Sequence, residues 1–390
     1  MTERLYYSDC YLHVFQARVV DTSADRLTVY LDRTAFYPSS GGQPFDTGSI
    51  SGAPVVDVVD EDDRVAHRLE RPWPAAGEGA VECAVDWTRR FDHMQQHTGQ
   101  HLLSAVFEEL FSLKTVSFHL GVETATIDLE GGPVDARTVE QAERRANQLI
   151  YENRPVAIRF EDAAAAAGLR KPSERQGTLR IISIEGLDRS ACGGTHVRAT
   201  GEIGVILVRK MEKIRQSTRI EFLCGERAVR RARADFLALT AAAQAFSSPL
   251  DEVPALVATQ LETARAAEKA RRKLEIELAG YQGKELYQTT APGPDGFRRV
   301  LRRAERGSLD ELRAIAQSFT ARDKAVFLAA LSDPPSILLS VSADSGIDAG
   351  RTLKAALTEA GGRGGGTARM AQGSVPDRAA VEGVLGKISC

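Results

Sequence analysis

Two pairs of potential metal ligands stand out in the sequence. His97 and His101 are four residues apart in HTGQHLL, a spacing that places both imidazoles on one face of a helix, about one turn apart. Cys192 and His196 are four residues apart in SACGGTHV, where two glycines permit a tight turn that directs a thiolate and an imidazole to one point. Two histidines at this spacing are often ordinary surface or core residues. Together, four nitrogen and sulfur donors in two short-spaced pairs predict a tetrahedral zinc site.

Residues next to these ligands narrow the chemistry. His93 lies one turn before His97 and is a rival ligand, which we interpret as lying outside the metal shell or at the surface. Thr98 follows His97, so the glutamate that acts as general base in HExxH metalloproteases is missing. Cys192 has a second possible role, as a catalytic thiolate paired with His196, but the two-histidine motif explains the pair better. The sequence leaves open whether all four ligands bind at once or one leaves room for water.

The elements that must position these ligands indicate an α+β multidomain protein. All 7 histidines lie in the first 196 residues, so metal chemistry belongs to the N-terminal half. Residues 1–88 contain short runs rich in Val and Thr, broken by turn clusters, and predict a small β-barrel-like domain. Residues 89–225 alternate helical and strand patterns, which predicts an α+β domain that contains the zinc site.

The C-terminal half has a different pattern. Residues 226–288 are rich in Ala, Arg, Glu and Leu and predict a helical, coiled-coil-like linker. Ser247, Ser248 and Pro249 interrupt this run, so we expect two helices rather than one. Residues 289–390 alternate strand-like and helical segments, which is typical of a compact α/β domain, and they include the glycine cluster GGRGGGTARMAQGS.

Length and composition set the outer limits of this interpretation. A chain of 390 residues exceeds what one hydrophobic core usually covers, and 43% hydrophobic with 26% charged residues is ordinary for a globular protein. A net charge of -3 excludes a uniformly basic protein but not a local basic track. The N-terminus has no basic, apolar secretion signal, and the 5 cysteines are scattered, which suits a reducing compartment. We therefore expect a cytoplasmic protein.

Three separated motifs, in order, carry a resemblance to a known family. The loop FYPSSGGQPFDTG, the segment HTGQHLL and the downstream CGGTH resemble the editing domain of alanyl-tRNA synthetase and its freestanding relatives, the AlaX proteins. GGRGGGTARMAQG is similar to GGKGGGRPDMAQGG, the signature of the DHH-associated domain that closes alanyl-tRNA synthetase. Length and domain order resemble the long AlaX form, and no segment resembles an aminoacylation module.

The resemblance implies a zinc-dependent aminoacyl-tRNA hydrolase that edits Ser-tRNA(Ala), and with it Gly-tRNA(Ala), in trans. An alanine-sized pocket cannot strongly reject a side chain that only adds a hydroxyl, whereas a second site that hydrogen-bonds the hydroxyl can discriminate against alanine. The resemblance implies a pocket lined by the strand after the histidine helix, where alternation puts three candidates on one face, and by the glycine loop. The substrate-binding candidates are Thr115, Ser117, His119, Gly41, Gly42 and Gln43.

The alternatives for these residues are a half-buried strand with polar side chains on its wet side, and a plain turn between strands. No catalytic residue beyond the zinc site is indicated, and no protein nucleophile is expected. The zinc would organise the site and help to place the substrate or the attacking water.

Binding of tRNA is expected at basic and glycine-rich segments. The glycine cluster does not form a Walker A loop, and by resemblance it offers N–H groups and cations to the tRNA backbone from Gly362, Gly364, Gly365, Arg363 and Arg369. The sequence departs from the family signature here, since Arg363 replaces a lysine and Ala368 and Arg369 replace Pro and Asp. Arginine clusters at 227–233, 265–273 and 298–303 are either solvated faces or a phosphate track.

Two other interpretations remain at this point. The protein is a tRNA-binding or regulatory protein with a structural zinc and no deacylase activity, or it is a zinc hydrolase of a small molecule, which would leave the glycine-rich domain unexplained. A homodimer, formed through the helical linker or through the C-terminal domain, is a further expectation. Neither the choice between serine and glycine nor the tRNA identity elements follow from the sequence.

Overall fold

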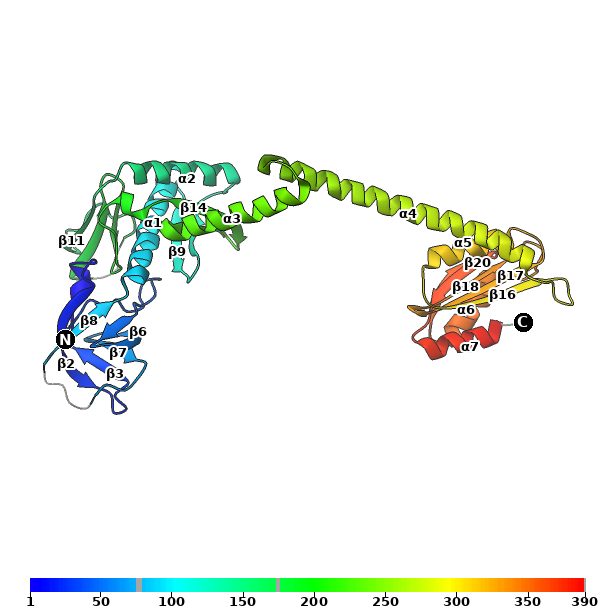
Figure 1. The fold of residues 1–390 in the computed structure, drawn as a ribbon, viewed down its shortest axis with the longest axis horizontal. Coiled ribbons are helices and arrows are strands. Elements are labelled where there is room, and N and C mark those ends of the chain that lie inside the picture. The colour runs from blue at the N-terminus through cyan, green and yellow to red at the C-terminus, as the bar shows by residue number, and fades with distance from the viewer. Residues whose placement is uncertain (75–78, 173–175, 389–390) are drawn as a thin grey trace. The chain divides into compact units, whose positions relative to one another are not determined.

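The computed structural model describes residues 1–74, 79–172 and 176–388, which divide into two compact units, Met1–Ala241 and Ala242–Cys390. Cys390 itself lies outside the described residues. Helices and strands are mixed in both units (Figure 1), so the predicted α+β multidomain class is confirmed. None of the helices in the described ranges combines the length and apolar character that crossing a membrane requires.

The first unit begins with a closed barrel of six strands. The strands follow the order β2-β3-β7-β6-β5-β8, and all neighbours are antiparallel. Alternating apolar residues point inward, as in Arg64–Leu69, where Val65 and Leu69 are buried. The strands are β2 (Val14–Thr22), β3 (Thr28–Leu31), β5 (Gly48–Ile50), β6 (Ala53–Glu61), β7 (Arg64–Leu69) and β8 (Ala80–Val85). A short parallel pair, β1 (Glu3–Arg4) with β4 (Arg33–Thr34), lies beside them.

Helix α1 (Trp87–Phe111) is the central element of the rest of this unit. It begins at Asp86, whose carboxylate accepts the Arg89 N–H, and it ends at Ser112 in the left-handed conformation. The helix is buried almost continuously from His93 to Phe107, which is why its polar residues must find partners inside the protein.

Two antiparallel sheets and helix α2 (Ala136–Tyr151) surround α1. The first sheet has the order β14-β15-β10-β9 and the second the order β11-β12-β13. Their strands are β9 (Lys114–Leu120), β10 (Ala125–Glu130), β11 (Val156–Asp162), β12 (Thr178–Ile184), β13 (Asp188–Ala191), β14 (Ile206–Ile214) and β15 (Ser217–Cys224).

Two helices occupy the segment predicted as helical. Helix α3 (Gly225–Phe246) ends just before Ser247, which has a φ of 51°, and helix α4 (Val253–Thr289) begins after a short 3-10 turn, η3 (Leu250–Glu252). Pro254 lies at the start of α4, where its missing N–H costs no helical hydrogen bond. The predicted break into two helices is therefore confirmed.

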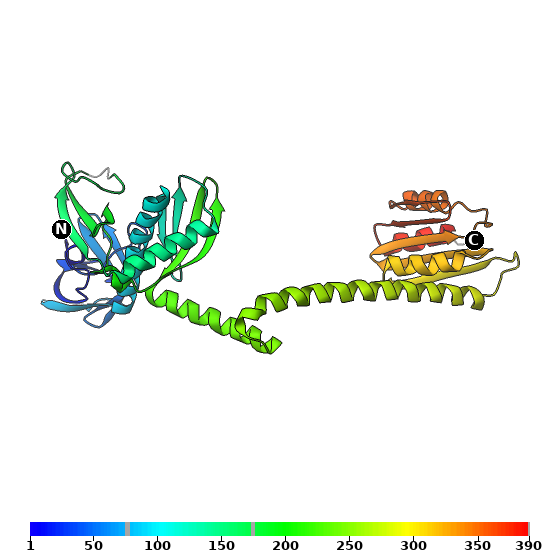
Figure 2. The same cartoon turned by 90° about the horizontal axis from the view of Figure 1, so that it is seen from above.

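The second unit is a mixed five-stranded sheet with helices on both faces. Its order is β16-β17-β18-β20-β19, with only the β16-β17 pair parallel. Helices α4 and α5 cover one face and α6 and α7 the other (Figures 1 and 2), so the sheet separates two apolar cores. The remaining elements are β16 (Arg298–Arg306), α5 (Leu309–Thr320), β17 (Ala325–Asp333), β18 (Pro335–Val341), α6 (Ala349–Glu359), β19 (Arg363–Gly366), β20 (Met370–Ser374) and α7 (Arg378–Ile388).

Candidate functional site

The four predicted ligands lie together in the first unit. One ligand atom from each of them falls within 4.8 Å of the others, and three of the four residues are buried; the four are His97, His101, Cys192 and His196. The first two project from one face of α1, and the other two come from the turn that follows β13. The Cys192 Sγ lies 3.4 Å from the Nε2 atoms of both His97 and His196. Three imidazoles and a thiol thus converge on one point.

The Nδ1 atom of each imidazole, on the side away from the cluster, contacts a different partner. The Nδ1 atom of His97 lies 2.9 Å from Gln43 Oε1, and that of His101 lies 2.8 Å from Asp188 Oδ2. The Nδ1 atom of His196 lies 3.1 Å from the Thr98 hydroxyl. With Nδ1 protonated and donating, each ring directs Nε2 into the cluster, an arrangement that metal-binding histidines almost always show.

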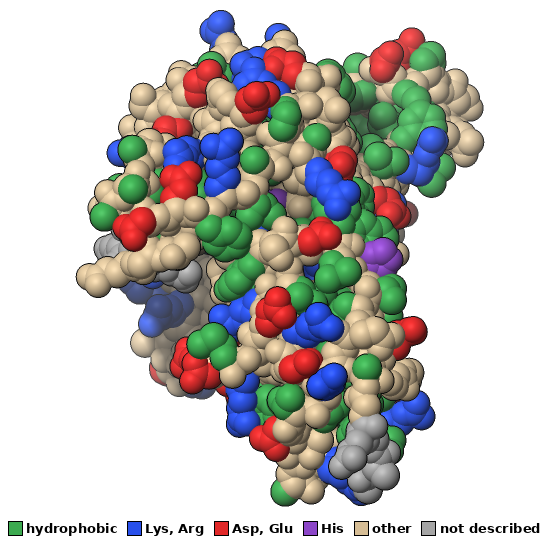
Figure 3. Space-filling view, turned by 90° about the vertical axis from the view of Figure 1, so that its left-hand side faces the viewer, with side chains coloured by type: hydrophobic (Ala, Val, Ile, Leu, Met, Phe, Trp, Pro, Cys, Tyr) green, Lys and Arg blue, Asp and Glu red, His purple; other side chains and the backbone are tan. Residues whose placement is uncertain are grey.

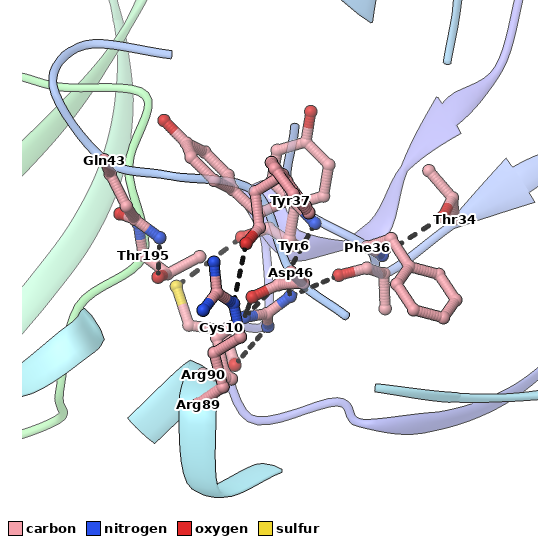
Figure 4. Close-up of polar contacts among 12 residues, drawn as sticks. Tyr6, Cys10, Thr34, Phe36, Tyr37, Gln43, Asp46, Arg89, Arg90 and Thr195 are labelled. Atoms are coloured by element: carbon pink, nitrogen blue, oxygen red, sulfur yellow. Dashed lines mark hydrogen bonds and ion pairs between the residues drawn. The ribbon is translucent and has the colours of Figure 1, made fainter. Parts of the chain in front are cut away.

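A buried ion pair anchors the loop that carries Gln43. Arg90 and Asp46 are both 0% exposed, and the Arg90 Nε lies 3.1 and 3.0 Å from the two carboxylate oxygens (Figure 4). Arg90 also donates to the Cys10 and Ala35 carbonyls. Asp46 in turn accepts the Tyr37 N–H at 2.7 Å and so closes the base of the loop 37–46. Arg90, about two turns before His97 on α1, thereby fixes the loop to the helix that carries His97 and His101.

The electrostatics of the cluster favour a thiolate. Burial opposes ionisation of Cys192, but the surrounding histidines, His97 first, hold the pKa of its thiol well below the ordinary value. Burial also opposes protonation of His101, yet its hydrogen bond to Asp188 and the nearby thiol raise the pKa of its imidazole to about 9. The pKa of His196 is lowered to about 3, chiefly by burial. A thiolate among imidazoles is a donor set that suits a borderline-soft divalent ion.

The cluster opens onto a cleft of about 460 Å³. Phe118 packs its ring 5.2 Å from that of His97 and forms part of the wall. Arg170, Lys171 and Arg180 contribute cations, whereas no carboxylate belongs to the wall within the described residues. The wall also includes Tyr7, Tyr37, Ser40, Gly41, Gln100, Phe160, Pro172, Thr178, Leu179, Ser190, Ala191, Gly193 and Gly194. The cleft therefore suits an anionic or polar ligand.

The prediction that Thr115, Ser117 and His119 share one face is wrong. The register between β9 and β10 shifts here, because Leu129 pairs with Thr115 while Asp128 pairs with Ser117. This bulge places Thr115 toward α1, where its hydroxyl donates to Ser104 Oγ at 2.7 Å, and leaves the other two exposed.

The glycine loop also differs from expectation, since of its three predicted residues only Gly41 lines the cleft. Gln43 is 2% exposed and both ends of its amide are engaged, since Nε2 donates to Thr195 Oγ1 at 2.8 Å and Oε1 faces His97. Its amide thus supports the ligands instead of facing an open pocket. Gly41 lines the cleft, as a substrate-binding loop requires, and Gly42 packs against β9, where its carbonyl accepts the Leu120 N–H. A Cβ on Gly42 would lie 2.8 Å from the Phe118 carbonyl oxygen.

One of the two alternatives expected for His93, a surface position, is wrong. His93 is not a surface residue: it is 2% exposed, and its Nδ1 has no partner among residues 1–74, 79–172 and 176–388. Burial, together with Arg89 and Arg227, lowers the pKa of its imidazole to about 3. His93 is therefore neutral and lies outside the four-residue cluster.

The glycine cluster of the second unit forms an edge of its sheet. Gly364 belongs to β19 and pairs with Gly373 of β20, directly under Leu357 of α6. Gly362 precedes this strand, and a Cβ there would lie 2.4 Å from the Ser374 carbonyl oxygen. Close packing explains both glycines, whereas Gly365 has nothing within 4 Å of its Cβ position. The cluster is thus partly a packing motif.

The two arginines of this cluster differ. Arg369 donates from Nε to the Val341 carbonyl at 3.0 Å and from a terminal nitrogen to the Thr320 carbonyl at 3.4 Å. Arg363 is exposed and takes part in no ion pair within the described part of the chain. Only Arg363 therefore keeps its guanidinium for a partner outside the chain.

Alanine substitutions at Gly364 and Gly365 distinguish a glycine that close packing requires from one that it does not. We expect Gly364→Ala to destabilise the second unit by about 1–2 kcal/mol, because its Cβ would lie 2.5 Å from both the Gln372 carbonyl oxygen and a Leu357 methyl group. Gly365→Ala should change the free energy of unfolding by less than about 0.5 kcal/mol. Thermal unfolding followed by circular dichroism measures both. Equal losses in the two variants would contradict the packing explanation.

The basic clusters are largely paired within the chain. Arg227 binds Asp92 and the Gly121 carbonyl, and Arg271 bridges Glu268 and Glu275. On the face shown in Figure 3, Lys and Arg side chains alternate with Asp and Glu. These runs therefore behave mainly as solvated, ion-paired faces.

Sequence reasoning missed several residues that shape the site. Asp188 and Ser190 alternate along β13, and Cys192 follows the strand in the same phase, so period two, counted back from Cys192, would have placed the first two beside the cluster. Gln100, one residue before His101, lines the cleft and donates to Ser104 Oγ. No sequence signal marked the ion pair of Arg90 with Asp46, which joins residues 44 apart.

Comparison with known proteins bears directly on this arrangement. Residues 179–221, which include two of the four ligands, match the family described as Threonyl and Alanyl tRNA synthetase second additional domain, and residues 300–389 match the DHHA1 domain. The chain is 33% identical to the alanyl-tRNA editing protein AlaX-L of Pyrococcus horikoshii over 96% of this chain and 95% of that protein. The chain belongs to the AlaX-L family of alanyl-tRNA editing proteins. The resemblance inferred from the three motifs is confirmed.

Two further relatives show how much of this chain is shared with other proteins. It is 40% identical to the alanyl-tRNA editing protein Aarsd1-B of Xenopus laevis over 52% of this chain and 50% of that protein. It is also 30% identical to the alanine--tRNA ligase of Pyrococcus abyssi over 96% of this chain but only 42% of the ligase. This chain thus corresponds to less than half the length of that ligase.

Proposed function

We propose that this protein is a zinc-dependent aminoacyl-tRNA hydrolase that removes serine, and with it glycine, from mischarged tRNA(Ala) in trans. The observation that carries the proposal is the convergence of three anchored imidazoles and a thiol on a cation-lined cleft in a chain of the AlaX-L family. Four donors with free Nε2 and Sγ atoms fit a zinc ion, which when bound supplies Lewis-acid polarisation of the ester carbonyl or of a water.

The chain's own residues would orient the substrate. Gln100 donates its Nε2 to Ser104 Oγ at 2.9 Å, and its Oε1 has no partner in the described parts of the chain. That oxygen can accept a hydrogen bond from a serine hydroxyl, whereas alanine would leave it unpaired, which disfavours alanine. Gly41 and the turn at Gly193 border the same cleft and offer backbone N–H groups. Cys192 is enclosed by imidazoles, which suits a ligand better than a nucleophile.

The same proposal covers the other parts of the chain. Residues 1–88 form the barrel part, 89–225 the editing part, 226–288 the helical linker and 289–390 the DHH-associated part, which would hold tRNA through Arg363 and neighbouring backbone. We also propose that the protein forms a homodimer through the linker or the C-terminal part. We propose that it is located in the cytoplasm.

The test is the rate at which the purified protein releases serine from Ser-tRNA(Ala), compared with release of alanine from Ala-tRNA(Ala). We expect fast release of serine, sparing of alanine, and loss of both zinc and activity in the His97→Ala, His101→Ala double variant. Glu108→Ala, on the same helix but outside the cleft wall, serves as the control. Zinc and tRNA bound without release above spontaneous hydrolysis would favour a tRNA-binding protein with a structural zinc.

A substitution at Gly194 tests whether His97 is a zinc ligand. A Cβ at this position would lie 2.2 Å from His97 Cε1, so Gly194→Ala must push that ring out of place. We expect zinc affinity to fall about tenfold, equivalent to about 1.4 kcal/mol. Gly193→Ala, whose nearest contact would be 3.8 Å, is the matched control and should retain zinc. Competition with a chromogenic chelator measures both; unchanged affinity in Gly194→Ala would exclude His97 as a ligand.

A further inference from the structure

An exposed aromatic ring stands at the cleft of the first unit. Phe160 is 53% exposed although it lies on β11, a strand whose other side chains partly pack inward. β11 is the edge strand of its sheet, and Phe160 pairs across to Arg180 of β12. Burying this exposed apolar surface would be favourable, so a flat apolar group that stacks on the ring would be stabilised there.

The ring belongs to the same sheet face as the metal ligands. Arg180, opposite Phe160, donates to the carbonyls of Cys192 and Gly194 at 2.7 and 2.8 Å and so fixes the turn that carries two ligands. Phe160 and Cys192 both line the cleft. A group stacked on Phe160 would therefore lie along the path that leads to the cluster.

A lysine of the same cleft wall supplies positive charge. Lys171 is exposed and forms no ion pair within the described residues, whereas Arg170 is bound to Asp188 at 2.6 Å and Arg180 to backbone carbonyls. No carboxylate of the described wall residues opposes Lys171. Proteins that bind single-stranded nucleic acid combine an aromatic ring with nearby cations in a positively charged groove, and this cleft has both features.

We propose that Phe160 and Lys171 form a binding subsite for the 3′-terminal nucleotide of the RNA. The base stacks on the Phe160 ring, and a backbone phosphate lies beside the Lys171 ammonium group. This inference rests on the proposed function, because it assigns a subsite to the same substrate. Stacking is insensitive to base identity, so the subsite contributes affinity and placement of the ester, not sequence recognition.

The kinetic test compares variants of Phe160 on Ser-tRNA(Ala). We expect Phe160→Ala to raise KM by roughly 5- to 100-fold with kcat nearly unchanged, because stacking is lost while the cluster is intact. Phe160→Trp should retain the wild-type KM, and Phe160→Leu, apolar but without a ring, should behave like the alanine variant. Tyr151→Ala, which removes an aromatic ring that is 77% exposed outside the cleft, is the control. Equal KM values for the leucine and tryptophan variants would overturn the proposal.

A binding test separates this subsite from the proposed function. The trinucleotide 5′-CCA-3′ is titrated into the full-length wild-type protein and the Phe160→Ala variant, whether or not the protein deacylates Ser-tRNA(Ala). We expect weaker binding in the variant, and equal binding would overturn the subsite even if serine is released. Lys171→Ala should lower the slope of log affinity against log salt by about 0.7, as for one phosphate contact on a single strand. Lys213→Ala, an exposed lysine outside the cleft, should leave that slope unchanged.

Discussion

Replacing Arg90 with methionine is expected to lower the free energy of unfolding of the first unit by about 3–5 kcal/mol. The Arg90 guanidinium is completely buried, and every one of its hydrogen bonds goes to Asp46 or to the carbonyls of Cys10 and Ala35. Methionine has similar length but no charge, so the Asp46 carboxylate would be left buried without a counter-ion. The same substitution frees the loop that holds Gln43 against His97, and zinc affinity should fall with stability.

The measurement is urea unfolding of the full chain followed by tryptophan fluorescence. The sequence contains 2 tryptophans, Trp73 and Trp87, and both belong to the first unit, so the signal reports that unit alone. Arg144→Met, which breaks an exposed pair with Glu140, is the control and should cost less than about 1 kcal/mol.

Adding Asp46→Asn to Arg90→Met should return part of the lost stability. The amide removes the uncompensated charge but can still accept the Tyr37 N–H. A loss below about 1 kcal/mol in Arg90→Met, or no recovery in the double variant, would contradict the anchoring role of this pair.

The grouping of the four candidate ligands could be predicted because it depends on short-range spacing. His97 and His101 need only a helix, and Cys192 and His196 need only a glycine turn, so each pair is fixed locally whatever surrounds it. The break between α3 and α4 is local in the same sense, since Ser247 to Pro249 cannot continue a helix.

The substrate wall could not be predicted because it depends on pairing between distant strands. Strand alternation places Thr115 with Ser117, but the register shift opposite Asp128 and Leu129 reverses the phase within β9. The extra residue of this bulge is Val116 of β9, and nothing in its residue type distinguishes it from an ordinary strand position. Phe118, outside the predicted set, consequently takes the place next to His97.

The supporting contacts escaped prediction for a related reason. Gln43 reaches His97 across 54 residues, and Asp188 reaches His101 across 87. A glutamine in a glycine loop resembles a residue displayed to a ligand, and only the tertiary arrangement reveals that its amide is already occupied. The chemistry of the cluster is thus set by contacts between segments far apart in the sequence, which no single motif predicts.

Asp188→Asn should change how zinc binding depends on pH. In the metal-free protein the Asp188 carboxylate helps to raise the pKa of His101 to about 9, so this imidazole carries an extra proton at pH 7. An imidazole must be neutral to bind zinc, so binding releases that proton, and affinity rises about tenfold per pH unit until pH reaches about 9. The asparagine still accepts the Nδ1–H but carries no charge, so the pKa of His101 should fall from its wild-type value.

The variant is therefore expected to release fewer protons than wild type, by up to about one, when zinc binds at pH 7. Calorimetry in buffers of different ionisation enthalpy counts these protons. Above pH 9, where His101 is neutral in both proteins, the variant should bind zinc about 10- to 100-fold more weakly, because the amide orients the imidazole less firmly than the carboxylate does. Asp128→Asn, which removes a carboxylate paired with Arg219 away from the cluster, should match wild type in both respects. Equal proton release in wild type and Asp188→Asn would mean that Asp188 does not control the protonation of His101, and the zinc shell would then have to be held by other contacts.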